Sequence, residues 1–210
     1  MSRRRARLGP DCLVGAVAAA CRGTGSARRE LLAGLTGTVC EVGAGPGTTF
    51  AYYPAAVERV IAVEPDRTLR RHAWNCAVTA SVAVQVRDGL AERLPLEDGV
   101  CDAVVFSLVL CSVPNLNAAA TEARRVLRPG GEIRFYEHVR STRPWMARAE
   151  DAMTPVWSRL AGGCHPNREP VAALVGAGFE RLRVRRLPFN PARGLPAFAH
   201  VLGCGAAPGR

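Results

Sequence analysis

The chain has 210 residues and a formal net charge of +10, from 28 basic residues, every one of them arginine, against 18 acidic residues. Hydrophobic residues make up 48% of it and no apolar run reaches the roughly 18 residues of a membrane-spanning helix, which excludes a disordered chain and a transmembrane protein. The positive charge would suit nucleic acid or an anionic surface. However, arginine replaces lysine throughout an Ala- and Gly-rich chain, which indicates a composition bias, and we expect no nucleic-acid binding.

The N-terminal segment has two interpretations. Three arginines at residues 3–5 precede an Ala- and Val-rich run at residues 12–21, as in a short export signal. A Gly-Pro-Asp break at residues 9–11 separates the basic part from the apolar part. We therefore favour an Arg-rich amphipathic helix that covers a cofactor site, and we assign residues 1–36 to an N-terminal helical cap.

Segments typical of strands and helices alternate in the rest of the chain. Apolar runs predict strands at residues 38–42, 59–63, 83–86, 102–109, 132–136, 179–187 and 197–205. Helical patterns occupy residues 49–57, 67–79, 117–127 and 168–176. Strands separated by helices form a parallel sheet, whereas the short Pro-rich linker before the last strand predicts a hairpin. We predict one α/β domain, residues 37–210, with a mostly parallel seven-stranded sheet, helices on both faces and an antiparallel last strand.

A glycine-rich motif directly follows the first predicted strand. It reads EVGAGPG over residues 41–47, and its glycines allow a ligand to approach the backbone closely. A dinucleotide site would have the pattern G-x-G-x-x-G and would hold a pyrophosphate. This motif is G-x-G-x-G after an acid, and the carboxylate of Glu41 would repel a phosphate. The motif therefore favours a cationic or amine-bearing ligand.

Polar groups also follow the next two strands. Glu64 stands at the tip of the second strand, where a carboxylate can accept hydrogen bonds from both hydroxyl groups of a ribose. Residues 87–96, after the third strand, offer a polar side chain and backbone N–H groups to the edge of an adenine. Because the carboxyl ends of parallel strands meet at one edge of the sheet, we expect one site there.

Together these motifs resemble the class I S-adenosylmethionine-dependent methyltransferases (methyltransferase type 11 domain). The resemblance runs from about residue 31 to residue 205 and is carried by VCEVGAGPGTTFAYYP, VIAVEPD, DGLAERLPLEDGVCDAVV and EARRVLRPGGEIRFYEHV. The segments FSLVLCSV, RVLRPGGEIRFYEHV and PVWSRLAGGCHPNRE are similar to the subgroup that includes thiol S-methyltransferases. The resemblance implies a Rossmann-like sheet, S-adenosyl-L-methionine as cofactor, S-adenosyl-L-homocysteine as product, and a small-molecule methyl acceptor for which a thiol is the best single candidate.

The resemblance also implies which residues bind the cofactor. These are Glu41, Gly43, Ala44, Gly45, Gly47, Glu64, Pro65, Ala91, Glu92, Ser107 and Leu108. Among them, Glu64 would hold the ribose, and Ala91 and Glu92 would lie beside the adenine. The chain departs from the pattern at Leu90, where many members have Asp, so a neighbouring group or water would hold the adenine amine.

Methyl transfer needs a nucleophile held about 3 Å from the methyl group, and a thiol must first lose its proton. His138, at the end of the fifth strand, is our candidate catalytic residue, as base or as orienting group, and a structural histidine is the alternative. An insertion or lid at about residues 141–168 contains Trp145, Trp157 and His165, which we expect to line the acceptor pocket. A plain packing role is the alternative for the two tryptophans.

Eight cysteines are present, without a C-x-x-C pair or zinc-finger spacing. Several lie in apolar runs, where free cysteine packs as a small hydrophobe, and we therefore expect a reducing compartment and a cytoplasmic location. Cys111 is expected to pack in this way, because methyl transfer needs no covalent enzyme intermediate. The chain has no acid-rich metal loop, so we expect no metal.

Alternating arginines at residues 181, 183 and 185 predict one face of the sixth strand that is all Arg, either solvated or facing an acidic partner. Several functions stay open beside a thiol acceptor: an O-, N- or C-methyltransferase of a secondary metabolite or quinone, a nucleotide-dependent oxidoreductase, and a non-catalytic cofactor-binding module. The glycine spacing and Glu41 count against the oxidoreductase. The intact glycine motif and Glu64 count against a decayed module.

Overall fold

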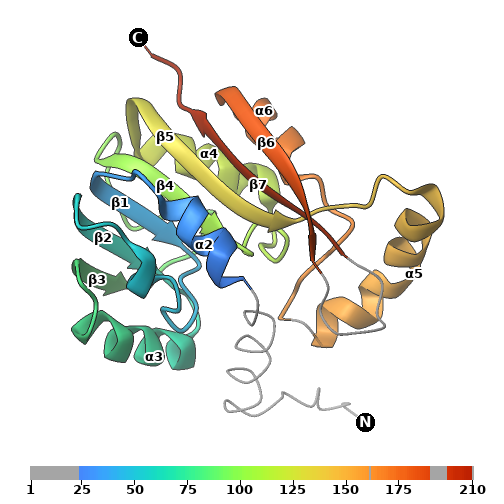
Figure 1. Cartoon of the computed structure of the whole chain (residues 1–210), viewed down its shortest axis with the longest axis horizontal. Helices are drawn as coiled ribbons and strands as arrows, with labels where there is room; N and C mark the ends of the chain where they lie inside the picture. The colour runs from blue at the N-terminus through green and yellow to red at the C-terminus, as the bar shows by residue number, and fades with distance from the viewer. Residues whose placement is uncertain (1–23, 161, 190–197, 210) are drawn as a thin grey trace.

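The computed structural model describes residues 24–160, 162–189 and 198–209 of the chain. Its centre is a seven-stranded sheet of order β3-β2-β1-β4-β5-β7-β6 (Figure 1). The strands are β1 (Gly37–Val42), β2 (Val57–Val63), β3 (Ala83–Arg87), β4 (Cys101–Ser107), β5 (Leu127–His138), β6 (Glu180–Phe189) and β7 (Phe198–Ala206). The pairs from β3 to β5 are parallel, and β7 runs antiparallel to both β5 and β6. The predicted mostly parallel sheet with an antiparallel last strand is confirmed.

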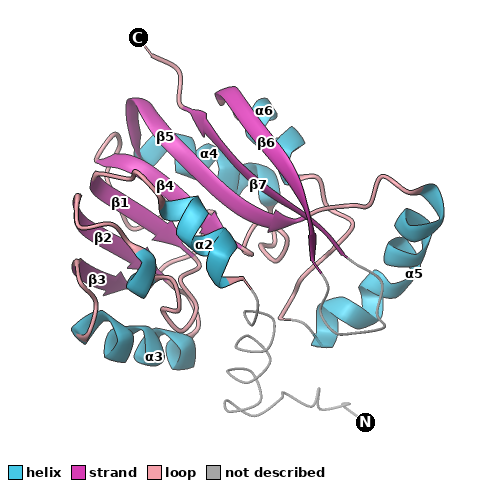
Figure 2. Ribbon diagram, in the orientation of Figure 1, coloured by secondary structure: helices cyan, strands magenta, loops and turns pink. Residues whose placement is uncertain are grey.

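Helices cover both faces of this sheet. They are α2 (Gly25–Leu32), α3 (Arg67–Val78), α4 (Leu116–Val126), α5 (Pro144–Leu160) and α6 (Pro170–Gly176), with a short 3₁₀ helix η1 (Phe50–Tyr52). In Figure 2, α2 crosses the front of the sheet, α4 and α6 lie behind it, and α5 stands off to one side. Within the ranges given above, every helix is too short or too polar to cross a membrane.

The sheet has a hydrophobic core on each face, because successive residues of a strand point to opposite sides. The face with α2 and η1 buries Leu31, Val39, Phe50, Val60 and Val105. The face with α4 and α6 buries Cys40, Val104, Phe106, Ala120 and Leu174. The strands β1, β2 and β4 are largely buried on both sides and read as apolar runs, and this is why the sequence pattern located them.

Polar caps explain why two of the helices begin where the pattern predicts. The carboxylate of Asp66 accepts the backbone N–H groups of Thr68 and Leu69 at 2.8 and 2.9 Å, and α3 begins there. The side-chain oxygen of Asn115 accepts the N–H of Ala118 at 3.0 Å at the start of α4. Such caps satisfy N–H groups that a helix cannot satisfy internally.

Two element predictions are wrong in part. Residues 49–57 do not form a regular helix beyond η1, because Pro54 disfavours helical backbone at Tyr53, which has ψ 131°. The fourth strand ends at Ser107 rather than at residue 109, since Leu108 takes a φ of +62°.

The prediction of an all-Arg face on β6 is also wrong in part. The register of β6 shifts between Glu180 and Arg183, and Arg181 has a φ of +53°, so the period-two pattern begins only after this irregularity. Val184, between Arg183 and Arg185, is itself 41% exposed. Arg185 forms an ion pair with Glu30 of α2 at 2.5 Å.

The strand order reverses between β1 and β4, and this position predicts a ligand crevice. The chain runs from β1 outward through β2 to β3, and then returns to β4 and continues to β5 in the other direction. Loops that leave two neighbouring strands in opposite directions open a crevice at the carboxyl edge of the sheet. Residues 1–23, which include most of the predicted cap and the export-signal question, lie outside the described residues.

Candidate active site

The loop after β1 uses backbone conformations that favour glycine. Gly43, Gly45 and Gly47 have φ angles of +66°, +56° and +82°. A Cβ atom at Gly43 would lie 2.7 Å from a methyl group of Val109, so this loop packs tightly against the turn after β4. A Cβ atom at Gly45 would meet nothing within 4 Å. The loop is therefore closed at Gly43 and open at Gly45, where a ligand can lie against the backbone.

Glu41 lies at the end of β1 and is only 2% exposed. Its carboxylate accepts hydrogen bonds from the hydroxyl groups of Thr49 and Tyr53, the latter at 2.9 Å. Burial raises the pKa of Glu41 to about 7, although the two hydrogen bonds act in the opposite direction. A cation bound nearby would favour the ionised carboxylate. The sequence did not indicate Thr49 and Tyr53, which follow the glycine motif within the same quoted segment.

Glu64 joins the tip of β2 to the glycine loop. Its Oε2 accepts the N–H of Gly45 at 2.8 Å and its Oε1 accepts the N–H of Asp66 at 2.9 Å. The residue is 5% exposed, and burial raises the pKa of its carboxyl group while these two hydrogen bonds lower it. Each carboxylate oxygen can accept a further hydrogen bond, so the pair of oxygens suits two neighbouring hydroxyl groups. The adjacent Pro65 is exposed.

The turn after β4 forms the opposite wall of the crevice. Ser107 Oγ is buried and has no hydrogen-bond partner among the described residues. Leu108 has a positive φ, a strained conformation that is common at functional sites. The fully buried carboxylate of Glu137 on β5 holds the turn by accepting the N–H groups of Val109 and Cys111 at 2.9 and 3.2 Å. Sequence reasoning missed this function of Glu137, whose only signal was an acid at the end of an apolar strand.

The loop after β3 contributes less polar surface to the crevice than we expected. Ala91 is 7% exposed and packs in the core, and the carboxylate of Glu92 accepts the N–H of Asn115 at 3.0 Å. Leu90 is 53% exposed. A cavity of about 830 Å³ borders the same loop and is lined mainly by residues 87–97. It does not include the glycine loop.

His138 lies at the carboxyl end of β5 beside the insertion. The residue is 7% exposed, its Nδ1 is 3.4 Å from Cys164 Sγ, and its ring centre is 4.4 Å from that of His200. Burial lowers the pKa of His138 to about 4, against the opposing effect of the Glu150 carboxylate. The imidazole is therefore neutral at pH 7.

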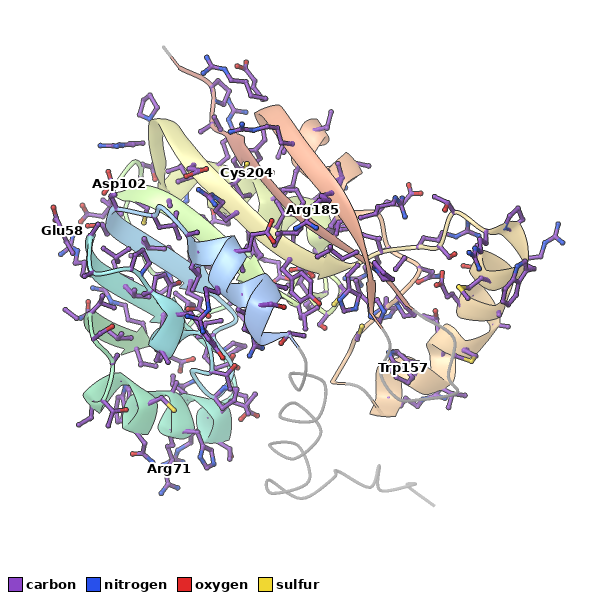
Figure 3. The ribbon with its side chains drawn as sticks, viewed as in Figure 1. Glu58, Arg71, Asp102, Trp157, Arg185 and Cys204 are labelled. Atoms are coloured by element: carbon purple, nitrogen blue, oxygen red, sulfur yellow. The ribbon has the colours of Figure 1, made fainter. Side chains whose placement is uncertain are left out.

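The insertion residues divide into two groups. The backbone N–H of His165 donates to the Cys111 carbonyl at 2.8 Å, which docks the end of the insertion on the turn after β4. The Trp157 side chain interacts with the Cys164 thiol. Trp145 does not join them, since it is 61% exposed on α5. Figure 3 shows Trp157 on α5, far from Asp102 near the start of the central strand β4.

These groups suit a particular kind of ligand. Two buried carboxyl groups, an open space at Gly45 and the unpaired hydroxyl of Ser107 lie at the carboxyl ends of β1, β2 and β4, and together they suit a hydroxyl-bearing and positively charged molecule. In the described part of the chain, no three His, Cys, Asp or Glu side chains are arranged to hold a metal ion.

Comparison with known proteins identifies the family. Residues 40–135 match the family described as "Methyltransferase domain". Thiol S-methyltransferase TMT1B of Homo sapiens is 34% identical over 196 residues, which cover 85% of this chain and 77% of that protein. Thiol S-methyltransferase TMT1A of Homo sapiens is 33% identical over 180 residues, which cover 77% of this chain and 71% of that protein.

A solved structure of an S-adenosylmethionine-dependent methyltransferase from Mesorhizobium loti has the same fold, with a TM-score of 0.64 and 14% identity over 89% of this chain and 99% of that one. The family model covers the motif region, the relatives cover most of the chain, and the solved structure shares the fold. The cofactor of the family suits the groups described above. The chain therefore belongs to the class I S-adenosylmethionine-dependent methyltransferases, in the group that contains the thiol S-methyltransferases, and S-adenosylmethionine is its methyl donor.

Proposed function

We propose that this methyltransferase moves a methyl group to the sulfur of a small thiol. The observation that carries the proposal is the 34% identity to a thiol S-methyltransferase over 85% of the chain, a span longer than the motif region alone. A quinone or secondary-metabolite acceptor is the alternative. We further propose that the protein works in the cytoplasm, because the six cysteines in the described part of the chain are all free thiols.

We also propose how the crevice holds the cofactor. Its residues are Glu41, Gly43, Ala44, Gly45, Gly47, Glu64, Pro65, Ala91, Glu92, Ser107 and Leu108, with Glu64 at the ribose hydroxyl groups. The geometry of the two Glu64 oxygens and the open space at Gly45 support this assignment. Residues 1–36 would cap the site, and the domain over residues 37–210 would hold the acceptor beneath the insertion at about 141–168, with Trp157 and His165 in the acceptor pocket. The exposed Trp145 of α5 is left out of this assignment.

The bound cofactor supplies an electrophilic methyl group on its sulfonium. The protein then has to hold a thiolate in line with that methyl group and keep water away. We propose that His138 orients the acceptor rather than deprotonating it. Moving a proton from a thiol of pKa about 8.5 to an imidazole of pKa about 4 would cost about 6 kcal/mol. The acceptor therefore ionises in water and binds as the thiolate.

Direct assay tests the acceptor class. Purified protein with S-adenosylmethionine and 2-mercaptoethanol is expected to form the methyl thioether and S-adenosylhomocysteine, measured by mass spectrometry. Ethylene glycol, which has the same shape with a hydroxyl group in place of the thiol, is the matched control and should not react. Turnover of amines, alcohols or quinones without any turnover of thiols would overturn the thiol proposal and favour the alternative.

Glu64→Ala tests the cofactor assignment. Loss of its charge-assisted hydrogen bonds is expected to weaken S-adenosylhomocysteine binding by about 1–3 kcal/mol, measured by calorimetric titration. Glu58→Ala, at the start of the same strand and exposed, is the control and should bind normally. Equal affinity of both variants would remove Glu64 from the site.

His138→Ala tests the orienting role. The variant should lose turnover with the thiol and keep its affinity for S-adenosylhomocysteine, because His138 lies on the acceptor side of the crevice. The exposed His72 on α3 provides the control variant, His72→Ala. Normal turnover in the His138 variant would contradict the orienting role and favour a structural role for this residue.

A further inference from the structure

Two thiols from distant parts of the chain meet beside the turn after β4. Cys111 lies in that turn and Cys164 near the end of the insertion, and their sulfur atoms are 3.5 Å apart. This is a non-covalent contact, since a disulfide bond has an S–S length of about 2.05 Å. A shift of about 1.5 Å, within the reach of side-chain rotation, would bring the two atoms to bonding distance.

Hydrogen bonds to the backbone around Cys111 hold this pair in place. The N–H of His165 donates to the carbonyl of Cys111 at 2.8 Å, and the guanidinium of Arg168 donates to the carbonyls of Leu110 and Val113. The Glu137 carboxylate fixes the N–H of Cys111 from the other side. The chain segments on both sides of the thiol pair are thus pinned to one another, which gives the contact a defined geometry.

The two cysteines differ in access and in acidity. Cys164 is partly exposed, whereas Cys111 is 1% exposed. The contact with Cys111 lowers the pKa of Cys164, with a further contribution from Trp157, against the effect of burial. The contact with Cys164 and burial both raise the pKa of Cys111. An accessible thiol of lowered pKa beside a buried thiol is the arrangement of an attacking and a resolving cysteine.

A second close pair shows what a purely structural arrangement looks like here. Cys40 on β1 and Cys101 at the start of β4 also interact, but both are 0% exposed in the core. No small molecule can reach either sulfur while the protein is folded. This pair therefore serves as an internal control for reactivity.

We propose that Cys111 and Cys164 form a redox-active dithiol that reduces small organic disulfides. The Cys164 thiolate attacks one sulfur of R–S–S–R, which forms a mixed disulfide and releases R–S⁻, and this thiolate takes up the proton that Cys164 lost. Cys111 then loses its proton and attacks the Cys164 sulfur, which releases the second R–S⁻ to take up that proton. One disulfide and two protein thiols become two small thiols and one Cys111–Cys164 disulfide. The proposal does not depend on the acceptor of methyl transfer.

The test uses the full-length reduced protein without oxygen and 2-hydroxyethyl disulfide as the probe. After the free thiols are alkylated, trypsin cuts at arginine and leaves Cys111, together with Cys101, in the peptide of residues 94–124 and Cys164 in the peptide of residues 160–168. We expect these two peptides to be cross-linked in most molecules and to separate on reduction. Fragmentation of the cross-linked peptide should show Cys101 alkylated and Cys111 in the disulfide. The peptide of residues 30–59, which contains Cys40, should stay reduced and alkylated.

Variants assign the two steps. Cys111→Ser should accumulate the mixed disulfide on Cys164 because nothing resolves it, and Cys164→Ser should form neither the adduct nor the cross-link. Cys76→Ser, which changes an exposed cysteine of α3, should give the wild-type cross-link. The wild-type measurement does not depend on whether any variant folds. Absence of the cross-link in folded wild-type protein, or its formation between the peptides of residues 30–59 and 94–124 instead, would overturn the proposal.

Discussion

At the scale of single residues, Glu41 is expected to link cofactor binding to pH. Its carboxyl group has a pKa of about 7 because it is buried, so a cation at the crevice must drive off a proton below that pH. The affinity for S-adenosylhomocysteine, whose α-amine is positive, should therefore fall by up to about tenfold per pH unit as the pH drops below 7. Calorimetric titration from pH 8 to pH 5.5 measures the slope.

Glu41→Gln provides the comparison. The variant keeps a hydrogen-bonding side chain beside Thr49 and Tyr53 but cannot ionise, so it should bind more weakly at pH 8 and lose most of the pH dependence. Glu64 also has a raised pKa and can retain a smaller slope. A slope equal to that of the wild type would show that another group controls the titration.

At the scale of elements, the sequence pattern located strands well and irregular segments poorly. Buried parallel strands are apolar on both faces, so their residues stand out as runs, and each predicted strand has a counterpart in the sheet. The 17-residue α5 was predicted only as an insertion, and it contains Pro155, which ordinarily ends a helix. Pro54, in contrast, prevents a regular helix at residues 49–57, where the local pattern favoured one.

The turn after β4 is the element whose stability depends most visibly on one side chain. Glu137→Ala would leave the buried N–H groups of Val109 and Cys111 without their acceptor, at a cost of about 1–3 kcal/mol each. Urea unfolding should show a lower free energy of unfolding, and the loss is large beside the total of about 5–15 kcal/mol that is typical of a folded domain. Glu137→Gln retains one carbonyl oxygen that can accept one of these N–H groups, so it should lose less free energy of unfolding than Glu137→Ala.

Glu132 gives a matched control on the same strand. It forms an ion pair with Arg134 at 2.7 Å, and the Glu132 side chain is 36% exposed. Surface pairs of this kind contribute at most about 1 kcal/mol, so Glu132→Ala should unfold close to the wild-type urea concentration. Equal losses in the Glu132 and Glu137 variants would contradict the proposed dependence of the turn on the buried carboxylate.

At the scale of the whole molecule, the sequence could predict one side of the site and not the other. Glu41, Glu64 and the glycine turn carry short-range signals, because each stands at the end of a strand or directly after one, and the positions of these strands are readable from the sequence. The contact between Cys111 and Cys164 spans 53 residues and depends on how the insertion returns to the sheet. No local pattern encodes that path, and the same holds for the ring contact of His138 with His200.

Two buried titratable groups, His200 beside His138 and Glu41 beside the glycine loop, should have opposite effects on how the free energy of unfolding changes with pH. Burial lowers the pKa of His200 to about 3, so at pH 4.5 to 6.5 the unfolded chain binds a proton there that the folded chain does not. His200 thus makes the free energy of unfolding rise with pH by up to about 1.4 kcal/mol per unit, and by about half of that at pH 6.5. Glu41, with its pKa raised to about 7, is protonated when folded and ionised when unfolded over the same range, so it contributes a slope of similar size and opposite sign.

Slopes can test this where absolute stabilities cannot, because a variant that is simply less stable shifts the whole curve without tilting it. Urea unfolding of each variant from pH 4.5 to pH 6.5 should show a smaller slope than the wild type for His200→Asn and a larger slope for Glu41→Gln. Each difference reaches at most about 1.4 kcal/mol per pH unit and is largest near pH 5.5, where the unfolded His200 is mostly protonated and the unfolded Glu41 mostly ionised. Curves parallel to the wild type in both variants would mean that neither group keeps its shifted pKa in the folded protein. A tilt in one variant alone would identify which side of the site holds its buried group in the uncharged form.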